Sequence, residues 1–194
     1  LQNALNFPAA ILQPPFFDPQ ASDAANYGGI GATIGHEISH SFDDQGAQFD
    51  AQGKLRDWWT PADLAHFQSA SQQLVAQFAA YKPFPDLAVN GQLTLSENLA
   101  DLAGVAAAHD AFTLSQQGKP AQANADRDFF IGYGVSWRSK AREAAARQQI
   151  LTDGHAPAQY RAATVRNLDA WYAAFGVQPG QQLYLAPEQR VRVW

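Results

Sequence analysis

Two histidines and a glutamate lie within five residues of this chain. The stretch "IGHEISHSFDDQG" contains His36, Glu37 and His40, which form the pattern H-E-x-x-H. Residues i and i+4 share one face of a helix, so the two imidazoles can bind one ion, for which zinc is the natural candidate. Glu37 is offset by about 100° around the helix, where it can accept a proton from a metal-bound water. The alternative interpretation is a hydrogen-bonded histidine pair in the core.

A third metal ligand is expected because catalytic zinc usually takes three protein ligands and a water. The stretch "SENLAD" places Glu97 on an otherwise apolar helix, with Asp101 one turn later on the same face. Two such carboxylates repel each other unless a cation or a hydrogen-bond donor binds them. We therefore expect Glu97 to bind the metal and Asp101 to accept a hydrogen bond from a metal-binding imidazole. A solvated acidic face is disfavoured by the apolar neighbours, and a structural zinc would need a fourth protein ligand.

Three further polar positions are candidates for the site. His155 lies in "TDGHAPAQYR", a loop with Gly and Pro where functional side chains are often found, although a lone loop histidine is commonly a surface residue. Arg161 follows six residues later. Asp43 and Asp44 come three and four residues after His40 and can either support this ligand or cap the helix. The sequence leaves both roles open, and we take Asp44 as the candidate supporting residue.

The elements that must position these residues are mainly helical. Ser22 or Asp23 is a candidate N-cap for a buried helix over about residues 22–42, which carries H-E-x-x-H. Residues 43–59 contain two Gly-centred turns that suit a hairpin. Thr60 and Pro61 begin a helix that ends at the Pro-rich residues 82–85. A helix over about residues 96–116 carries "SENLAD".

The remaining segments are expected to be two further helices and two irregular ends. The apolar pattern predicts one long helix over residues 126–151 and a last helix over residues 156–175. Residues 3–19 contain four prolines and suit an extended, buried lead-in. The C-terminal tail is expected to be a short segment that is held against the rest of the protein. We expect residues 1–194 to form part of a single domain.

Composition excludes several classes of function. The formal net charge is −5 and the Lys and Arg residues are scattered, which disfavours a nucleic-acid partner. The chain has no cysteine, so disulfides, thiolate catalysis and Cys-based metal sites are excluded. We find no apolar run of membrane-spanning length. The chain does not begin with Met, so we interpret Leu1 as an internal start, and any upstream targeting signal cannot be read.

The chain resembles the C-terminal catalytic part of the neprilysin and endothelin-converting-enzyme family of zinc metallopeptidases. The matching stretches are "FPAAILQPPFFD", "NYGGIGATIGHEISHSFDDQG", "DWWT", "LSENLADLAG", "DGHAPAQYR" and the terminal "RVW". The resemblance implies a portion of a thermolysin-like (gluzincin) catalytic domain, a helical bundle with few short strands. It also implies a metalloendopeptidase that uses one Zn²⁺ and prefers an apolar residue after the scissile bond.

The resemblance also implies a role for each site residue. His36, His40 and Glu97 would bind zinc, while Glu37 would polarise the attacking water and Asp101 would orient His36. His155 would stabilise the oxyanion of the tetrahedral intermediate, and Arg161 would hold a substrate backbone carbonyl. The pocket for the residue after the scissile bond would be lined by Ile11, Phe16, Ala32, Thr33 and Trp137. Ala32 and Thr33 are smaller than the bulky residues that the family has there.

One departure from the family concerns the substrate-binding strand. Family members carry an Asn-Ala pair on an edge strand upstream of the Phe-Pro segment, whereas "QNAL" here lies too close to Phe7 to be that strand. We therefore expect the chain to begin after this strand and to lack the upstream sheet and the large helical lobe. Its partners would be peptides and this missing N-terminal part.

The resemblance also suggests an origin, a location and an activity for the chain. The absence of cysteine fits a bacterial member, and the family favours a periplasmic or secreted location. The rival hypothesis is an inactive zinc-bound fragment or a peptide-binding module. Glu37 and His155 argue against that rival, because binding alone requires neither.

Overall fold

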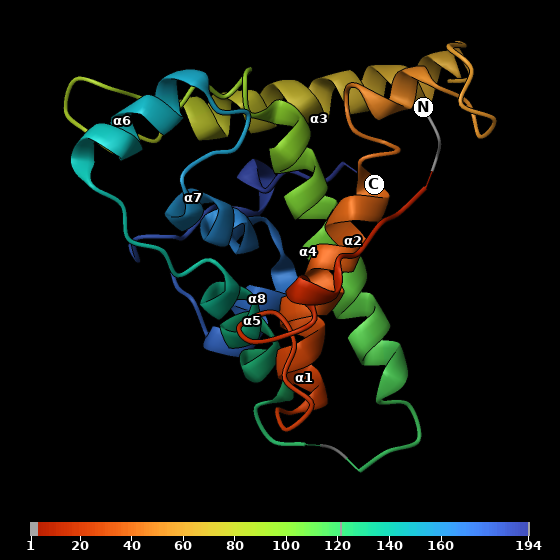
Figure 1. The fold of residues 1–194 in the computed structure, drawn as a ribbon, viewed down its shortest axis with the longest axis vertical. Helices are drawn as coiled ribbons and strands as arrows, with labels where there is room; N and C mark the ends of the chain where they lie inside the picture. The colour runs from red at the N-terminus through yellow and green to blue at the C-terminus, as the bar shows by residue number, and fades with distance from the viewer. Residues whose placement is uncertain (1–3, 121, 194) are drawn as a thin grey trace.

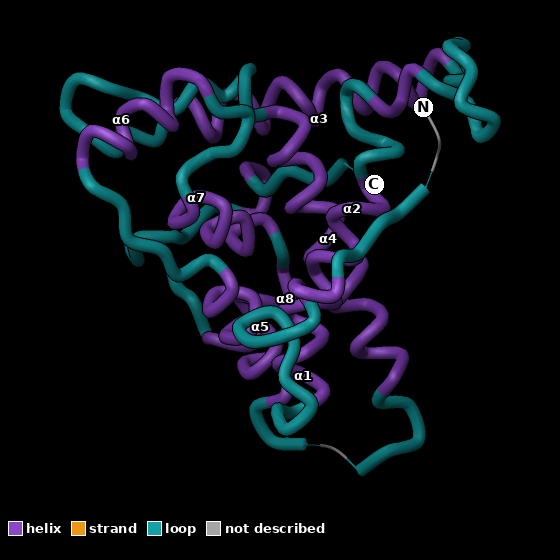
Figure 2. Tube along the Cα trace, in the orientation of Figure 1, coloured by secondary structure: helices purple, strands orange, loops and turns teal. Residues whose placement is uncertain are grey.

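The computed structural model describes residues 4–120 and 122–193, so Asn3 of the lead-in and Trp194 of "RVW" lie outside the described residues. Helices dominate the structure (Figure 2), which confirms the mainly helical class. The few short strands expected are reduced, within these ranges, to two isolated bridges, Phe49 with Leu55 and Phe84 with Leu87. No helix in the described part of the chain is both long and apolar enough to span a membrane.

The helix that carries H-E-x-x-H is built from three segments. These are α1 (Asp23–Asn26), a π-helical turn η2 (Tyr27–Gly31) and α2 (Ala32–Ser39), and they follow one another with right-handed helical backbone angles at both junctions. Ser22 caps the start by accepting a hydrogen bond from the N–H of Ala25. The helix ends at its C-cap His40, slightly before residue 42. The expectation of a buried helix was wrong on one face, because Ile34 and Ile38 are exposed.

Helices α3 (Pro61–Ala79) and α4 (Leu95–Ser115) have nearly the expected bounds. Thr60 caps α3 by accepting a hydrogen bond from the N–H of Asp63, and Leu74 and Phe78 of α3 are fully buried. Figure 1 shows α2 and α4 side by side, with α3 lying across the N-terminal end of α4. The core joins α3 and α4 to α5 and to the C-terminal segment, where Val191 and Val193 are buried. The tail is therefore tied down, as expected.

Close backbone contact lets α2 lie against α4. A Cβ atom added to Gly35 would lie 2.6 Å from the carbonyl oxygen of Gly104, and one added to Gly104 would lie 2.4 Å from the backbone N of His36. Real Cβ atoms do not approach backbone this closely, so both positions require glycine. The two glycines thereby bring the first histidine next to the helix that carries Glu97.

Both long helices predicted for the C-terminal half were wrong, because each is interrupted. The first is split into α5 (Ala125–Ser136) and α6 (Glu143–Thr152); the intervening residues 138–142 are exposed, so a continued helix would bury nothing there. The second is split into α7 (Ala158–Ala162), the 3₁₀ helix η4 (Ala163–Asn167) and α8 (Asp169–Phe175). The break at Leu168 leaves Asn167 buried, where its Oδ1 accepts hydrogen bonds from the N–H of Val191 and the side chain of Gln77.

The buried lead-in was also a wrong expectation. Its described residues are exposed or half-buried and include a short 3₁₀ helix, η1 (Ala9–Ile11). Residues 43–59 contain a second 3₁₀ helix, η3 (Gly46–Gln48), and the Phe49–Leu55 bridge in place of a full hairpin. Another 3₁₀ helix, η5 (Pro187–Gln189), precedes the C-terminal segment.

Candidate metal centre

Three side chains from α2, its C-cap and α4 converge on one point. The Nε2 atoms of His36 and His40 lie 3.1 Å apart. The carboxylate of Glu97 places Oε2 at 3.3 Å from Nε2 of His36 and Oε1 at 3.6 Å from Nε2 of His40. The three side chains offer ligand atoms that all lie within 4.8 Å of one another, the only such group of three found among the described residues. One ion can therefore reach all three.

Each imidazole is oriented by a carboxylate on its other nitrogen. Nδ1 of His36 lies 2.9 Å from Oδ1 of Asp101, and Nδ1 of His40 lies 2.7 Å from Oδ2 of Asp43. An ionised carboxylate can only accept a hydrogen bond, so each Nδ1 carries a proton, and a ring that carries no second proton presents a lone pair at Nε2. Two lone pairs facing each other beside a carboxylate repel unless a cation lies between them. This donor set of two imidazoles and one carboxylate fits zinc.

The electrostatics of the cluster favour bound positive charge. Burial lowers the pKa of His36, but hydrogen bonds to Asp101 and Glu97 outweigh it and raise this pKa to about 9. The hydrogen bond to Asp43 likewise raises the pKa of His40 above its ordinary value. Burial raises the pKa of Glu97, but the hydrogen bond to His36 and the nearby positive charges bring it below the ordinary value. Protons and a metal ion therefore compete for the same nitrogens.

Asp43, and not Asp44, contacts His40. The carboxylate of Asp43 is buried and also accepts the backbone N–H groups of Gln45 and Gly46. The chain folds back tightly here, since a Cβ atom on Gly46 would lie 1.8 Å from the carbonyl oxygen of His40. Asp44 instead accepts a hydrogen bond of 2.6 Å from the hydroxyl of Ser96, beside Glu97. The turn that follows the helix therefore determines that Asp43, and not Asp44, contacts His40.

Arg161 contacts two acidic residues of α4, Glu97 of the cluster and Asp101. Its Nε and Nη2 donate to Asp101 at 2.7 and 2.9 Å, and Nη2 also donates to Oε2 of Glu97 at 3.2 Å. The guanidinium lies 4.2 Å from the ring centre of Trp137, and the carbonyl oxygen of Arg161 accepts a hydrogen bond from the hydroxyl of Tyr133. Arg161 is only 8% exposed, and these contacts hold its side chain in a single orientation.

His155 points one ring nitrogen at the cluster. Nε2 lies 3.1 Å from Oε2 of Glu97, and Nδ1 lies 2.7 Å from Oδ1 of Asp153. The same oxygen of Asp153 accepts the backbone N–H of His155, so the loop forms a tight local turn. Sequence reasoning missed Asp153, although its spacing of two residues before His155 is typical of such a turn.

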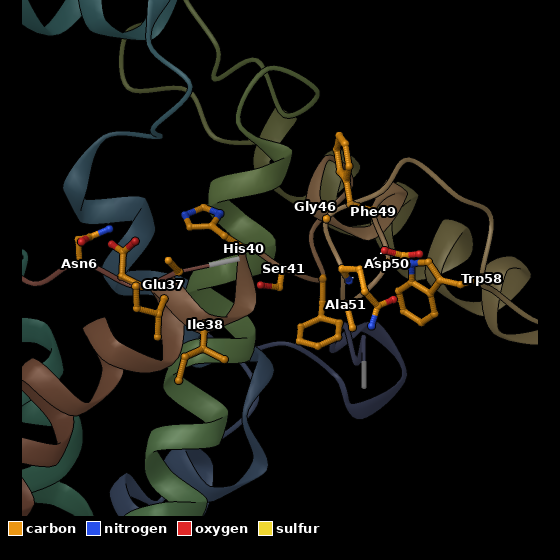
Figure 3. A pocket seen from close by; sticks show the side chains of 15 residues that line it. Asn6, Glu37, Ile38, His40, Ser41, Gly46, Phe49, Asp50, Ala51 and Trp58 are labelled. Atoms are coloured by element: carbon orange, nitrogen blue, oxygen red, sulfur yellow. Dashed lines mark hydrogen bonds between the residues drawn. The ribbon is translucent and has the colours of Figure 1, made fainter. Parts of the chain in front are cut away.

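Glu37 and His40 lie on the wall of a cavity of about 930 Å³. Figure 3 shows Glu37, Ile38 and His40 on one side of this cavity and Phe49, Asp50 and Trp58 on the other. Much of the remaining wall is apolar and includes Leu5 and Phe42. Glu37 is exposed, so its carboxylate is accessible beside the candidate metal ligands.

The residues proposed for the substrate pocket lie elsewhere. Ile11, Phe16 and Trp137 do not line the cavity of Figure 3. The carbonyl oxygen of Phe16 accepts the N–H of Ile30, and the hydroxyl of Thr33 donates to the carbonyl oxygen of Gly29. The structure thus brings Phe16 and Thr33 to the turn η2, while Trp137 lies over Arg161.

The chain is similar to known proteins over its whole length. Residues 1–191 match Peptidase family M13. The sequence is 44% identical to a protein named neutral endopeptidase from Lactobacillus helveticus and 40% identical to human membrane metallo-endopeptidase-like 1. All of this chain is covered in both cases, with 29% and 26% of those proteins. The crystal structure of the inhibitor-bound zinc metalloprotease Zmp1 from Mycobacterium tuberculosis matches 96% of the chain with a TM-score of 0.93 and 47% identity.

The relatives are much longer than this chain. The chain spans less than a third of the curated proteins named above and 30% of the Zmp1 chain. The similarity therefore concerns one part of those proteins. In this chain, the matching region contains the cluster of His36, His40 and Glu97.

Proposed function

The chain belongs to Peptidase family M13, and we propose that it carries the catalytic centre of a zinc-dependent peptidase that hydrolyses internal peptide bonds. The observation that carries this proposal is the convergence of His36, His40 and Glu97 within reach of one ion. A second support is the accessible carboxylate of Glu37 on the wall of the adjoining cavity. Several relatives are named endopeptidases, which agrees with this reaction.

The metal would be held by side chains that already converge on one point. His36, His40 and Glu97 would be the ligands, and Asp101 and Asp43 would keep the two imidazoles oriented and their Nδ1 atoms protonated. When bound, zinc would lower the pKa of a water and polarise the scissile carbonyl. Three protein ligands leave room for that water, as catalytic sites require.

The remaining residues would move protons and hold charge. Glu37 would accept a proton from the attacking water and deliver it to the leaving amine. His155 would donate from Nε2 to the oxyanion that develops on the carbonyl oxygen. Arg161 uses Nε and Nη2 on the two carboxylates of α4, and Nη1 would be the donor to a substrate backbone carbonyl on the leaving-group side.

The substrate would be a peptide with an apolar residue after the scissile bond. We assign the pocket for that residue to Ile11, Phe16, Ala32, Thr33 and Trp137. Ala32 and Thr33 are smaller than the residues that the family has at these positions, which would make this pocket larger.

The active protein would contain more than this catalytic part. Because the relatives are over three times as long, we propose that an N-terminal part of the same protein supplies the peptide-binding strand and a covering lobe. Residues 1–194 would form one catalytic domain portion that works outside the cytoplasm. A chain without that N-terminal part would bind zinc and turn over peptides slowly or not at all.

Peptide hydrolysis by the zinc-loaded full-length protein tests the proposal. We expect a quenched fluorescent peptide to be cleaved, the activity to disappear with a chelator and to return with added zinc. Glu37→Gln should lower kcat by a factor of about 10²–10⁴ and keep one zinc per chain, because it removes a proton acceptor and no ligand. Glu188→Gln changes an exposed glutamate in η5 and is the matched control. Near-normal activity of Glu37→Gln would contradict the mechanism.

A further inference from the structure

The π-helical turn η2 interrupts the helix just before its metal ligands. The N–H of Ala32 donates to the carbonyl oxygen of Tyr27, five residues earlier, which widens the helix locally. π-helical turns are rare and occur often at functional sites. Ile30, in the middle of the turn, lies six residues before His36, which corresponds to about 9 Å along the helix axis.

The turn and the residue before it hold a loop by its backbone. The N–H of Ile30 donates to the carbonyl oxygen of Phe16 at 2.7 Å. Asn26 makes two more bonds: Oδ1 accepts the N–H of Asp18 at 2.9 Å and Nδ2 donates to the carbonyl oxygen of Asp18 at 2.8 Å. Three hydrogen bonds therefore fix the loop backbone at residues 16–18 to one side of the helix, whatever the loop side chains are.

Gly29 gives the loop the room it needs. A Cβ atom added to Gly29 would lie 2.4 Å from the carbonyl oxygen of Phe16 and 3.2 Å from its carbonyl carbon. A Cβ atom on Gly31, in the same turn, would meet its nearest neighbours at 3.6–3.7 Å, an ordinary contact distance. The close approach of the loop therefore depends on the first of these glycines and is independent of the second.

The same turn also contacts the other proposed walls of the pocket. The carbonyl oxygen of Gly29 accepts the hydroxyl of Thr33 and the N–H of Ala32. On its other side, a Cβ atom on Gly28 would lie 2.0 Å from the carbonyl oxygen of Phe129 in α5, the helix that ends next to Trp137. One turn of helix thus joins the loop, the start of α2 and α5.

We propose that Asn26 and Gly29 are specificity-determining positioning residues, which set the size of the pocket for the residue after the scissile bond by holding Phe16 at the π-helical turn. This inference rests on the proposed function and adds to it the part of the chain that selects the substrate. Because Ala32 and Thr33 are small, the position of Phe16 limits the space, and a fixed loop selects a Leu-sized side chain over an Ala-sized one.

Two glycine variants of the zinc-loaded full-length protein separate this role from general stability. Gly29→Ala and Gly31→Ala carry the same change in the same turn, but only the first pushes the loop away. The substrates are two peptides that differ only in Leu or Ala after the scissile bond. We expect Gly29→Ala to lower the ratio of kcat/KM for Leu over Ala about tenfold, mainly through KM, with unchanged zinc content. Gly31→Ala should keep the wild-type ratio.

A second pair of variants leaves the π turn intact. Asn26→Ala removes both bonds to Asp18 and should lower the same ratio, whereas Gln20→Ala, at an exposed position of the same loop, should not. This pair decides the question if Gly29→Ala does not fold. Wild-type ratios in folded Asn26→Ala would overturn the inference and leave the proposed function standing. If the wild-type protein cleaves neither peptide in a zinc-dependent way, the proposed function is overturned and this inference with it.

Discussion

Each candidate metal-binding imidazole in this protein is held by its own carboxylate, and the two carboxylates come from different places. Asp101 reaches His36 from α4, while Asp43 reaches His40 from the turn directly after the helix. Asp101 is also bound by Arg161, so its position is determined from two sides. Such partners set the ring orientation and strengthen the imidazole as a ligand.

The raised pKa of His36 predicts how zinc binding depends on pH. Below about pH 9 this imidazole is protonated in the metal-free protein, and the proton competes with zinc at Nε2. Zinc affinity should therefore keep rising between pH 6.5 and about pH 9 and level off above it, where His36 is neutral. Competition with a chromophoric chelator across this range measures it. An affinity that is already constant above pH 7 would contradict the assignment.

The neighbouring aspartates Asp43 and Asp44 give a matched pair. Asp43→Asn replaces the carboxylate on Nδ1 of His40 with an amide, and we expect zinc affinity to fall by about 10–100-fold. Asp44→Asn changes the hydrogen bonds from the hydroxyl of Ser96 and the side-chain amide of Gln45, neither of which involves His40, and should cost less. Isothermal titration with zinc distinguishes them, and the reverse order of the two losses would show that Asp44 is the supporting residue.

At the scale of elements, the metal centre depends on how closely two helices approach. Its ligands come from α2, the C-cap of α2 and α4, and the contact of Gly35 with Gly104 sets the distance between these helices. The close contact lies directly before His36 and seven residues after Glu97. Neither helix could bring the ligand atoms together without the other.

Gly104→Ala tests this contact. The new Cβ atom would lie 2.4 Å from the backbone N of His36, so α2 and α4 must separate. We expect a loss of about 1–3 kcal/mol in the free energy of unfolding and weaker zinc binding. Gly134→Ala in α5 is the control: no atom lies within 4 Å of its added Cβ, and it should hold or raise stability by about 0.5–1 kcal/mol. Denaturant unfolding and zinc titration measure both, and equal zinc affinities would contradict the prediction.

At the scale of the whole molecule, the metal centre links parts of the chain that are far apart in sequence. Asp43 and Glu97 are separated by more than fifty residues, and Arg161 and His155 reach the cluster from the C-terminal half. In Figure 1 the helices α2, α4 and α7, which carry or flank these residues, lie around the middle of the molecule. A ligand bound there would stabilise contacts among all of them.

Zinc should therefore raise the melting temperature. Free zinc at about 1,000 times its Kd stabilises the folded state by about 4 kcal/mol. For a chain of this size each kcal/mol shifts Tm by about 2–4 °C, so we expect an increase of about 8–16 °C over the chelated protein. Differential scanning fluorimetry measures this shift. His40→Ala removes one ligand and should abolish most of it, and an undiminished shift in that variant would place the metal elsewhere.

Local patterns in the sequence were sufficient for several features. The spacing of His36 and His40 puts both on one helix face, and Thr60 with Pro61 marks the start of α3, because these relations involve residues within one helical turn. The carboxylates of Glu97 and Asp101 were recognisable because they interrupt an apolar helix. The identities of the candidate ligands therefore followed from the sequence alone.

The tertiary structure decided the features that depend on distant contacts. It placed Asp43 rather than Asp44 against His40, paired Arg161 with Asp101, and interrupted both long C-terminal helices. It also exposed the lead-in and joined Phe16 to the π-helical turn. Helical periodicity records which residues share a face, but burial, chain reversal and close backbone approach depend on segments that meet only in the folded chain.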